Sequence, residues 1–123
     1  MLQNLKEADI TYKARGSEFE FIKIVFLDEK ENCSMKIQEV VFGDFKMFEV
    51  PKKDFLELVA SLDNCKMAFP SFSNGKAGNQ YQLEIQSGEN AMNYKWFGDS
   101  PGEQWKDIIG FASKLVELKN KFL

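Results

Sequence analysis

The side chains of this chain that could do chemistry are carboxylates, amines and two thiols, because its 123 residues include no histidine. Without imidazole there is no Ser-His-Asp or Cys-His nucleophile, no histidine general base and no histidine metal ligand. Arginine, the usual side chain for bidentate phosphate recognition, occurs only at Arg15, against fifteen lysines. The sequence therefore predicts a protein that is not an enzyme and uses no cofactor.

Carboxylates are densest in two short segments. Asp28, Glu29 and Glu31 fall within one predicted hairpin turn, and Asp99 and Glu103 stand where a helix is predicted to begin. A Ca²⁺ loop needs oxygen ligands at alternating positions together with a glycine, and a lysine interrupts that pattern in the turn. Acidic residues at a helix start are explained by their favourable interaction with the helix dipole. We expect a solvated turn and a helix start, with no metal site in either segment.

The two thiols, Cys33 and Cys65, are separated by 31 residues, a spacing that fits no metal-binding or redox motif. Only Lys66, next to Cys65, could lower a thiol pKa. We expect both cysteines to be small apolar residues in a reducing cytosol, with a structural disulfide as the alternative. The glycines at 75 and 78 do not form a phosphate loop, because a strand rather than a helix is predicted to follow them.

Composition and charge describe an ordinary globular chain. Hydrophobic residues make up 44% and charged residues 28% of the sequence, and the net charge is −3. A chain of this length buries roughly two-thirds of its unfolded surface, so we expect one domain spanning residues 1–123. The N-terminus lacks the apolar core of a signal peptide, and no apolar run approaches the roughly 18 residues of a membrane span. The sequence predicts a cytoplasmic protein without a membrane partner.

Hydrophobic periodicity predicts four strands, a helix, two strands and a second helix. Apolar residues alternate with polar ones in the strands, whereas Phe55, Leu58, Val59 and Leu62 form one stripe of a helix. This order is typical of an α+β domain: a single antiparallel sheet of about six strands with two helices packed on one face. The predicted strands cover residues 10–14, 18–28, 33–42, 45–50, 81–86 and 92–96, and the helices 52–62 and 101–121.

The strand at 18–28 differs from the others because apolar residues occupy both of its faces. Phe19, Phe21, Val25 and Leu27 alternate with a second apolar set on the opposite face. Such a pattern is typical of a central strand that is covered on both sides.

Two groups of large apolar side chains exceed what one sheet face needs. The first lies in the long connection at 64–79, and the second lies to one side of the last helix. Either the connection folds under the helix end and both groups are buried, or they are exposed and mark a protein interface. The candidate anchors are Met67, Phe69 and Phe72 in the connection and Phe111, Leu118 and Phe122 in the helix.

These features favour a non-enzymatic intracellular domain that binds another protein or a second copy of itself, as an inhibitor, immunity protein, chaperone or dimeric adaptor. The apolar anchors would hold the partner, and Asp28, Glu29 and Glu31 would steer a basic surface toward them. The alternative is single-stranded nucleic-acid binding on the open sheet face, where aromatic residues alternate with lysines. The residues of that alternative are Tyr12, Lys13, Phe19, Phe21, Lys23, Lys36, Phe42, Lys46 and Phe48.

The order of the predicted strands and helices resembles that of known protein families in two ways. Residues 10–62, four strands and a helix, are similar in order to the repeats of the Whirly and Pur-alpha single-strand binders, which implies nucleic-acid binding on the sheet. Residues 19–122 resemble the small acidic chaperones of type III secretion effectors in size, acidity and element order, which implies a dimer formed partly through helix and strand. Residues 1–63 carry 9 cations and 13 anions, and this acidity opposes phosphate binding. Protein binding is therefore the leading hypothesis.

Overall fold

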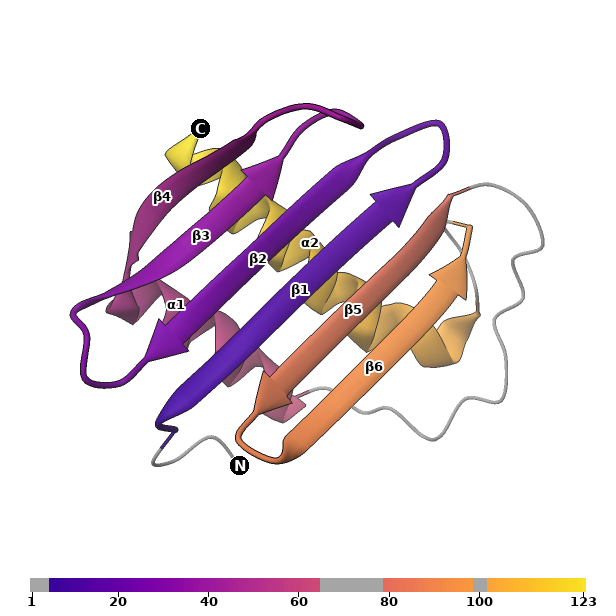
Figure 1. The fold of residues 1–123 in the computed structure, drawn as a ribbon. Coiled ribbons are helices and arrows are strands. Elements are labelled where there is room, and N and C mark those ends of the chain that lie inside the picture. The colour runs from indigo at the N-terminus through magenta and orange to yellow at the C-terminus, as the bar shows by residue number, and fades with distance from the viewer. Residues whose placement is uncertain (1–4, 65–78, 99–101) are drawn as a thin grey trace.

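Six strands and two helices make up the part of the chain that the computed structural model describes, residues 5–64, 79–98 and 102–123 (Figure 1). The fold class predicted from the sequence is confirmed: one antiparallel sheet carries two helices in the expected order. The strands are β1 (Glu7–Arg15), β2 (Glu20–Leu27), β3 (Asn32–Gln38), β4 (Phe45–Pro51), β5 (Gln80–Ser87) and β6 (Asn90–Phe97), and the α-helices are α1 (Lys52–Ala60) and α2 (Lys106–Phe122). Two short 3₁₀ helices, η1 (Ser61–Asn64) and η2 (Glu103–Trp105), follow α1 and precede α2.

The strands lie side by side in the order β4-β3-β2-β1-β5-β6, and every neighbouring pair is antiparallel (Figure 1). Four of the five pairings join strands that are consecutive in the chain. The fifth places β5 beside β1, so Ile10 lies opposite Ile24 on one side and opposite Ile85 on the other. This pairing makes β1 and β2 central and leaves β4 and β6 as the two edges of the sheet.

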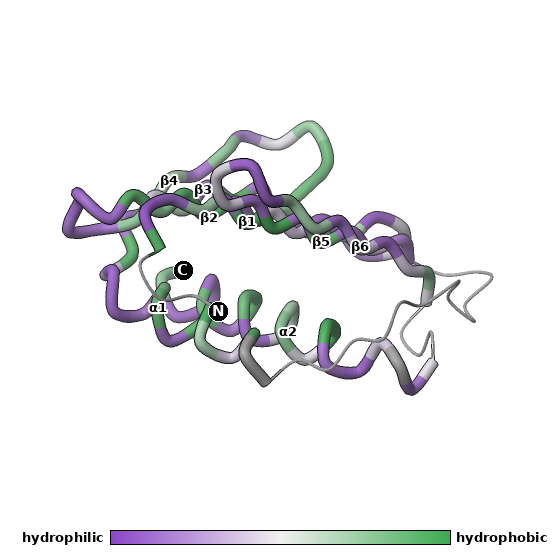
Figure 2. Tube along the Cα trace, turned by 90° about the horizontal axis from the view of Figure 1, so that it is seen from below, coloured by the Kyte–Doolittle hydropathy of each residue, from purple (hydrophilic) through white to green (hydrophobic). Residues whose placement is uncertain are grey.

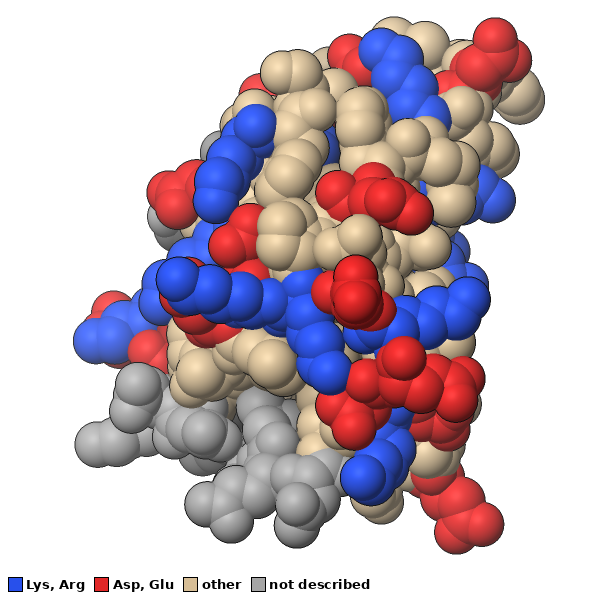
Figure 3. Space-filling view, turned by 90° about the vertical axis from the view of Figure 1, so that its left-hand side faces the viewer, with Lys and Arg blue, Asp and Glu red and all other residues tan. Residues whose placement is uncertain are grey.

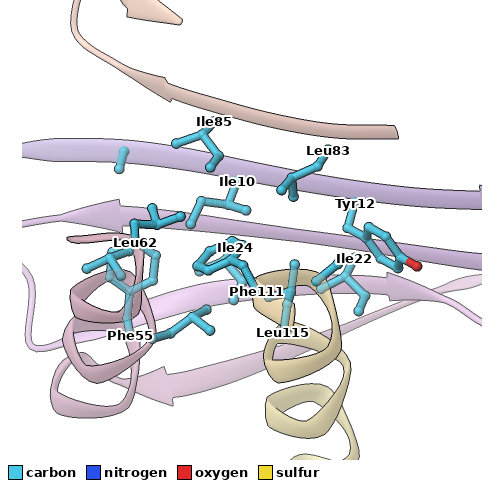
Figure 4. Close-up of a cluster of buried hydrophobic side chains, with 14 of the residues drawn as sticks. Ile10, Tyr12, Ile22, Ile24, Phe55, Leu62, Leu83, Ile85, Phe111 and Leu115 are labelled. Atoms are coloured by element: carbon cyan, nitrogen blue, oxygen red, sulfur yellow. The ribbon is translucent and has the colours of Figure 1, made fainter. Parts of the chain in front are cut away.

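Both helices lie on the same face of the sheet (Figure 2). Because successive side chains of a strand point to opposite faces, every second residue of each strand faces the helices. The core is therefore a layer of strand side chains packed against Phe55 from α1 and against Phe111 and Leu115 from α2 (Figure 4). The strand residues labelled in that layer are Ile10, Tyr12, Ile22, Ile24, Leu83 and Ile85.

No helix or strand of the described residues covers the opposite face of β2, so they do not show the expected cover on both sides. Phe21, Val25 and Leu27 point away from the helices and remain partly exposed. Their burial comes from neighbouring strands, because both described helices occupy the other face. Apolar residues on both faces of a strand here indicate a central position in the sheet without indicating two covering layers.

Several element boundaries differ from the predicted ones, and the largest differences are at the end of β3 and at the start of α2. The third strand ends at Gln38 instead of continuing to residue 42. Its strand pairing therefore stops before the apolar residues at 40–42. The last helix begins as the short turn η2 and becomes α-helical at Lys106, whereas its predicted cap at residues 100 and 101 lies outside the described residues.

An ion pair between a buried lysine and a partly buried glutamate joins the end of α2 to the start of β2. The Lys119 ammonium donates to the Glu20 carboxylate, and Lys119 is the single buried charged residue in the described ranges, with 8% of its surface exposed. A charge taken out of water is tolerated when a partner of opposite charge and a hydrogen bond accompany it. The pair thus sets the position of the α2 end over the sheet.

Replacing Lys119→Met keeps the aliphatic stem, removes the charge and leaves Glu20 without its partner. We expect the free energy of unfolding to fall by about 2 kcal/mol, because breaking a buried pair leaves one charge uncompensated. Lys121→Met is the matched control, because Lys121 also lies on α2 and pairs with Asp54 of α1 but has a largely exposed side chain. Its loss should cost about 0.5 kcal/mol or less. Urea unfolding at pH 7 measures both variants, and equal losses would contradict the structural role of the buried pair.

Candidate functional site

The connection between β3 and β4 carries the most exposed apolar side chains of the molecule's described part. It rises off the open face of the sheet, on the side away from the helices, and its tip is hydrophobic (Figure 2). Val40 and Val41 are each more than half exposed, and Phe42 is 99% exposed. Three consecutive apolar residues cannot all face one side of a strand, and here they follow the residue at which β3 ends.

The backbone holds this connection in a tight turn. The Gly43 amide donates to the Val40 carbonyl at 3.0 Å, and the Gln38 side-chain amide donates to the Gly43 carbonyl at 3.0 Å. A Cβ added to Gly43 would lie 2.5 Å from Val40 Cγ2, so a larger residue does not fit this turn. The turn is therefore defined by hydrogen bonds and by a close approach that requires glycine.

Phe42 has a backbone conformation that L-residues disfavour. Its φ is 61°, and no other non-glycine residue in the described ranges has a positive φ. The left-handed region costs a residue with a side chain about 1–2 kcal/mol, and a bulky residue there is an outlier. The Phe42 ring nevertheless lies in solvent. Backbone strain of this kind is concentrated at functional sites in proteins.

Two residues of β4 continue the apolar surface. Phe45 and Met47 alternate on the open face of the sheet, and at least half of each side chain is exposed. Five of the nine large hydrophobic residues exposed in the described ranges fall between positions 40 and 47, so they are concentrated at one corner. We call them the apolar patch: Val40, Val41, Phe42, Phe45 and Met47.

A groove of about 360 Å³ lies between this connection and the β1–β2 hairpin. Its volume is in the range that a few apolar side chains or a small ligand occupy. Phe21 and Phe45 lie on either side of Gln38, one of the residues that line the groove. Their rings meet edge to face at 5.7 Å, and the Lys36 ammonium lies 4.1 Å above the centre of the Phe45 ring. The groove is lined by Arg15, Gly16, Glu18, Phe19, Gln38, Val41 and Phe42.

The open sheet face beside the patch is basic. The strand register places five cations in the half of this face that is nearer the β3–β4 connection, with Glu84 as the only carboxylate of the strands there. None of the five forms an ion pair within the described part of the chain. We call these five residues the basic face: Lys13, Arg15, Lys23, Lys36 and Lys95. The strand carboxylates of the other half are Glu7, Asp9 and Glu49.

The β4 edge itself has mixed charge. In the view of Figure 3, which looks on to the β4 side of the molecule, blue and red side chains interleave with uncharged surface between them. Lys46 of this edge pairs with Glu39 at 2.6 Å. The positive charge is thus a property of the open face and does not extend over the edge strand.

The apolar anchors predicted on the last helix are not exposed as a patch. Phe111 is 2% exposed and belongs to the core, so for this residue the alternative of burial within the protomer holds and it is not an exposed anchor. Leu118 and Phe122 are half-buried and pack against the core. The side chains of the wide apolar arc of α2 pack within the protomer, because α2 contacts both the core layer of the sheet and α1. The other three predicted anchors, Met67, Phe69 and Phe72, lie outside the described residues.

The acidic hairpin predicted to steer a partner lies at the opposite end of β3 from the apolar patch. Glu29 and Glu31 are exposed there. Asp28 instead pairs with Lys52 at 3.0 Å, and the hydrogen bond and charge of Lys52 lower the pKa of Asp28. This pair stabilises the fold at pH values above the ordinary carboxylate pKa and is lost as the pH falls. The structure does not bring the predicted anchors and the predicted steering residues into one surface.

The apolar patch was missed although the sequence contains a signal for it. Val40, Val41 and Phe42 are consecutive, so they break the alternation of the strand to which they were assigned, and Gly43 follows directly. These residues lie outside the sheet because β3 ends at Gln38. Of the residues named for the nucleic-acid alternative, Phe42 lies in the patch and Lys13, Lys23 and Lys36 lie on the basic face.

The carboxylates and the Cys33 thiol are the described side chains to consider for metal or nucleophilic chemistry. No three Cys, Asp and Glu residues in residues 5–64, 79–98 and 102–123 are grouped as a metal site. Cys33 is buried, and burial raises the pKa of its thiol to about 11 in spite of the opposing charge of Lys52. No described helix is both long and apolar enough to cross a membrane.

No protein-family model and no curated protein matches the sequence of this chain. Its function is therefore inferred from the geometry of the apolar patch, the groove and the basic face.

The buried thiol of Cys33 should resist chemical modification. In a Cys65→Ser variant at pH 8, well below a pKa of about 11, Cys33 should remain a thiol and react with Ellman's reagent only after urea unfolds the protein. The time course of absorbance at 412 nm, with and without urea, measures this. Rapid reaction of the folded variant would contradict the burial of Cys33.

Replacing Phe42→Asn should not destabilise the fold. The ring contacts almost nothing, and asparagine tolerates the left-handed conformation better than phenylalanine, so we expect unfolding free energy to be unchanged or to rise by about 1 kcal/mol. Urea unfolding measures the difference from the unmodified chain. A loss of more than about 1 kcal/mol would mean that Phe42 packs on its own protomer, against this account.

Proposed function

We propose that this chain is a non-enzymatic domain that binds another protein through the apolar patch. The observation that carries the proposal is Phe42, which is 99% exposed and held at a φ of 61° in a turn defined by hydrogen bonds. An aromatic side chain that costs stability and contributes no packing is explained when a partner buries it. Aromatic anchors of this kind supply much of the affinity of protein interfaces.

The surroundings of Phe42 support a protein partner. Exposed apolar residues gather around it, and the adjacent groove offers space for side chains of the other protein. Polar and charged residues rim the patch, including Glu18, Gln38 and Asp44. An apolar centre with a polar rim is the usual composition of a protein interface.

Single-stranded nucleic-acid binding is a second candidate, because one observation favours it. The half-buried Phe21 and the exposed Phe45 lie on the open face in one cross-strand row with Lys13, and Lys23 and Lys36 lie in the next row. Bases could stack on the rings while phosphates contact the lysines. Three of the five patch residues are aliphatic, however, and offer no ring on which a base could stack. We therefore rank this candidate second.

The test is affinity capture from native cell extract with the tagged chain and its Phe42→Asn variant. We expect a protein that the unmodified chain retains and that Phe42→Asn loses by about tenfold, since removing an interface anchor costs 1–2 kcal/mol or more. Capture must survive nuclease treatment, which separates a protein partner from one held through nucleic acid. Sedimentation of the purified chain shows in parallel whether that partner is a second copy.

Leu123→Asn is the control, because Leu123 is about as exposed as Val41 and lies outside the patch. It should retain the partner fully. If Phe42→Asn and Leu123→Asn capture the same proteins as the unmodified chain, the proposal fails. If a fluorescent fifteen-residue oligothymidylate instead binds the chain at low salt and Phe45→Ala abolishes that binding, the second candidate replaces it.

A further inference from the structure

The five cations of the basic face form an unneutralised group. Elsewhere in the described chain, six lysines contact carboxylates, among them Lys46, Lys52 and Lys119. On the basic face there is no such contact, although the whole chain has a net charge of −3 and more acidic than basic residues. An acidic protein that leaves five cations unpaired on one surface has a local field opposite in sign to its overall charge. Such a field selects a partner by charge complementarity.

Two of these lysines face each other across the sheet. Lys23 of β2 lies directly opposite Lys36 of β3 in the strand register. Like charges at directly opposed positions destabilise a sheet, and a carboxylate at either position would reverse the effect. The pair contributes no ion pair or capping contact to the fold among the described residues. Its arrangement lowers stability and creates a site for an anion.

The lysine pair is continuous with the docking surface. Lys36 lies directly opposite Met47 of the patch, and its ammonium rests over the ring of Phe45. Lys13 lies directly opposite Phe21, whose ring contacts that of Phe45. A partner that covers the patch and extends along the face would therefore meet the lysines. The apolar contacts and the charges belong to one surface.

We infer that the partner of the apolar patch is an acidic protein surface, whose carboxylates contact the basic face while its apolar side chains cover the patch and enter the groove. This inference rests on the proposed function and adds the chemistry of the partner. It reverses the charge expected from the sequence, in which Asp28, Glu29 and Glu31 would attract a basic partner, because that hairpin lies at the far end of β3.

Carboxylates fit this surface better than the phosphates of a nucleic acid. Glu18 lines the groove, Asp44 belongs to the connection and Glu84 lies among the cations. A continuous phosphate backbone would be repelled by these acids, whereas a protein surface of mixed sign can place cations or polar groups against them. The Phe45 ring is half exposed, but the Lys36 ammonium lies over one of its faces and the Phe21 ring contacts it edge to face, so a base would compete with Lys36 for that face.

The test uses Lys23→Glu and a zero-length cross-linker. This substitution places an opposite charge across from Lys36, so the melting temperature should be unchanged or slightly raised, while the affinity for the captured partner should fall about tenfold. Lys53→Glu on α1 is the matched control, since Lys53 is exposed, has no ion pair in the described chain and lies on an element of the opposite side. It should bind as the unmodified chain does.

Carbodiimide coupling of the complex, followed by mass spectrometry, identifies the contacting groups directly, because it joins an amine to a carboxylate as an amide without a spacer. We expect cross-links from Lys13, Lys23 or Lys36 to aspartate or glutamate of the partner. Cross-links from Glu29 or Glu31 to partner lysines would overturn the inference. So would carboxylates from a second copy of this chain, capture that nuclease abolishes, or unchanged binding by Lys23→Glu.

The outcomes separate the two proposals. A partner whose capture depends on Phe42 but is indifferent to Lys23→Glu leaves protein binding in place and refutes the acidic partner. A chain whose captured proteins are indifferent to Phe42→Asn refutes protein binding by the patch itself. Loss of capture by Lys23→Glu with an unchanged melting temperature, together with the expected cross-links, supports both.

Discussion

The burial of one face of the sheet by two helices is the constraint on which the rest of this structure depends. All six strands turn alternate residues toward that layer, and α1 and α2 supply the side chains that close it. Apolar area removed from water is the dominant favourable contribution to folding, so the register of each strand is determined by which residues must face the helices. The central pairing of Ile10 with both Ile24 and Ile85 brings the two halves of the chain into one core.

The open face follows from the same constraint. Once the apolar residues of each strand face the helices, the alternate residues face solvent. Core packing does not restrict which residue types occupy those positions. That set is basic near the β3–β4 connection and acidic toward the other end of the strands. The exposed turn at Phe42 rises from this face, so apolar and charged groups that could meet a partner lie on the same side of the molecule.

Stability and recognition make opposite demands at two positions. The left-handed backbone of Phe42 and the opposed lysines Lys23 and Lys36 both lower the stability of the isolated chain. The Phe42 ring lies in solvent, and the Lys36 ammonium contacts the Phe45 ring but no carboxylate among the described residues. A buried ion pair such as Lys119–Glu20 has a local structural purpose, because it positions α2 over the sheet. Lys119 and Glu20 thus stabilise the fold, whereas Phe42 and the opposed lysines would gain favourable contacts only from another molecule.

The sequence by itself determined the fold class, because period-two alternation and the stripe containing Phe55 are local consequences of burying one face. It could not determine where surplus apolar residues would lie. It left open whether Phe111 would be buried or exposed, and the packing of α2 against the sheet and beside α1 placed it in the core. The patch at Phe42 and the grouping of lysines arise from strand register and from the point at which β3 ends, and both depend on pairings between residues distant along the chain. Tertiary structure decided the site for that reason: a surface is made of neighbours in space, and local periodicity specifies only neighbours along one element.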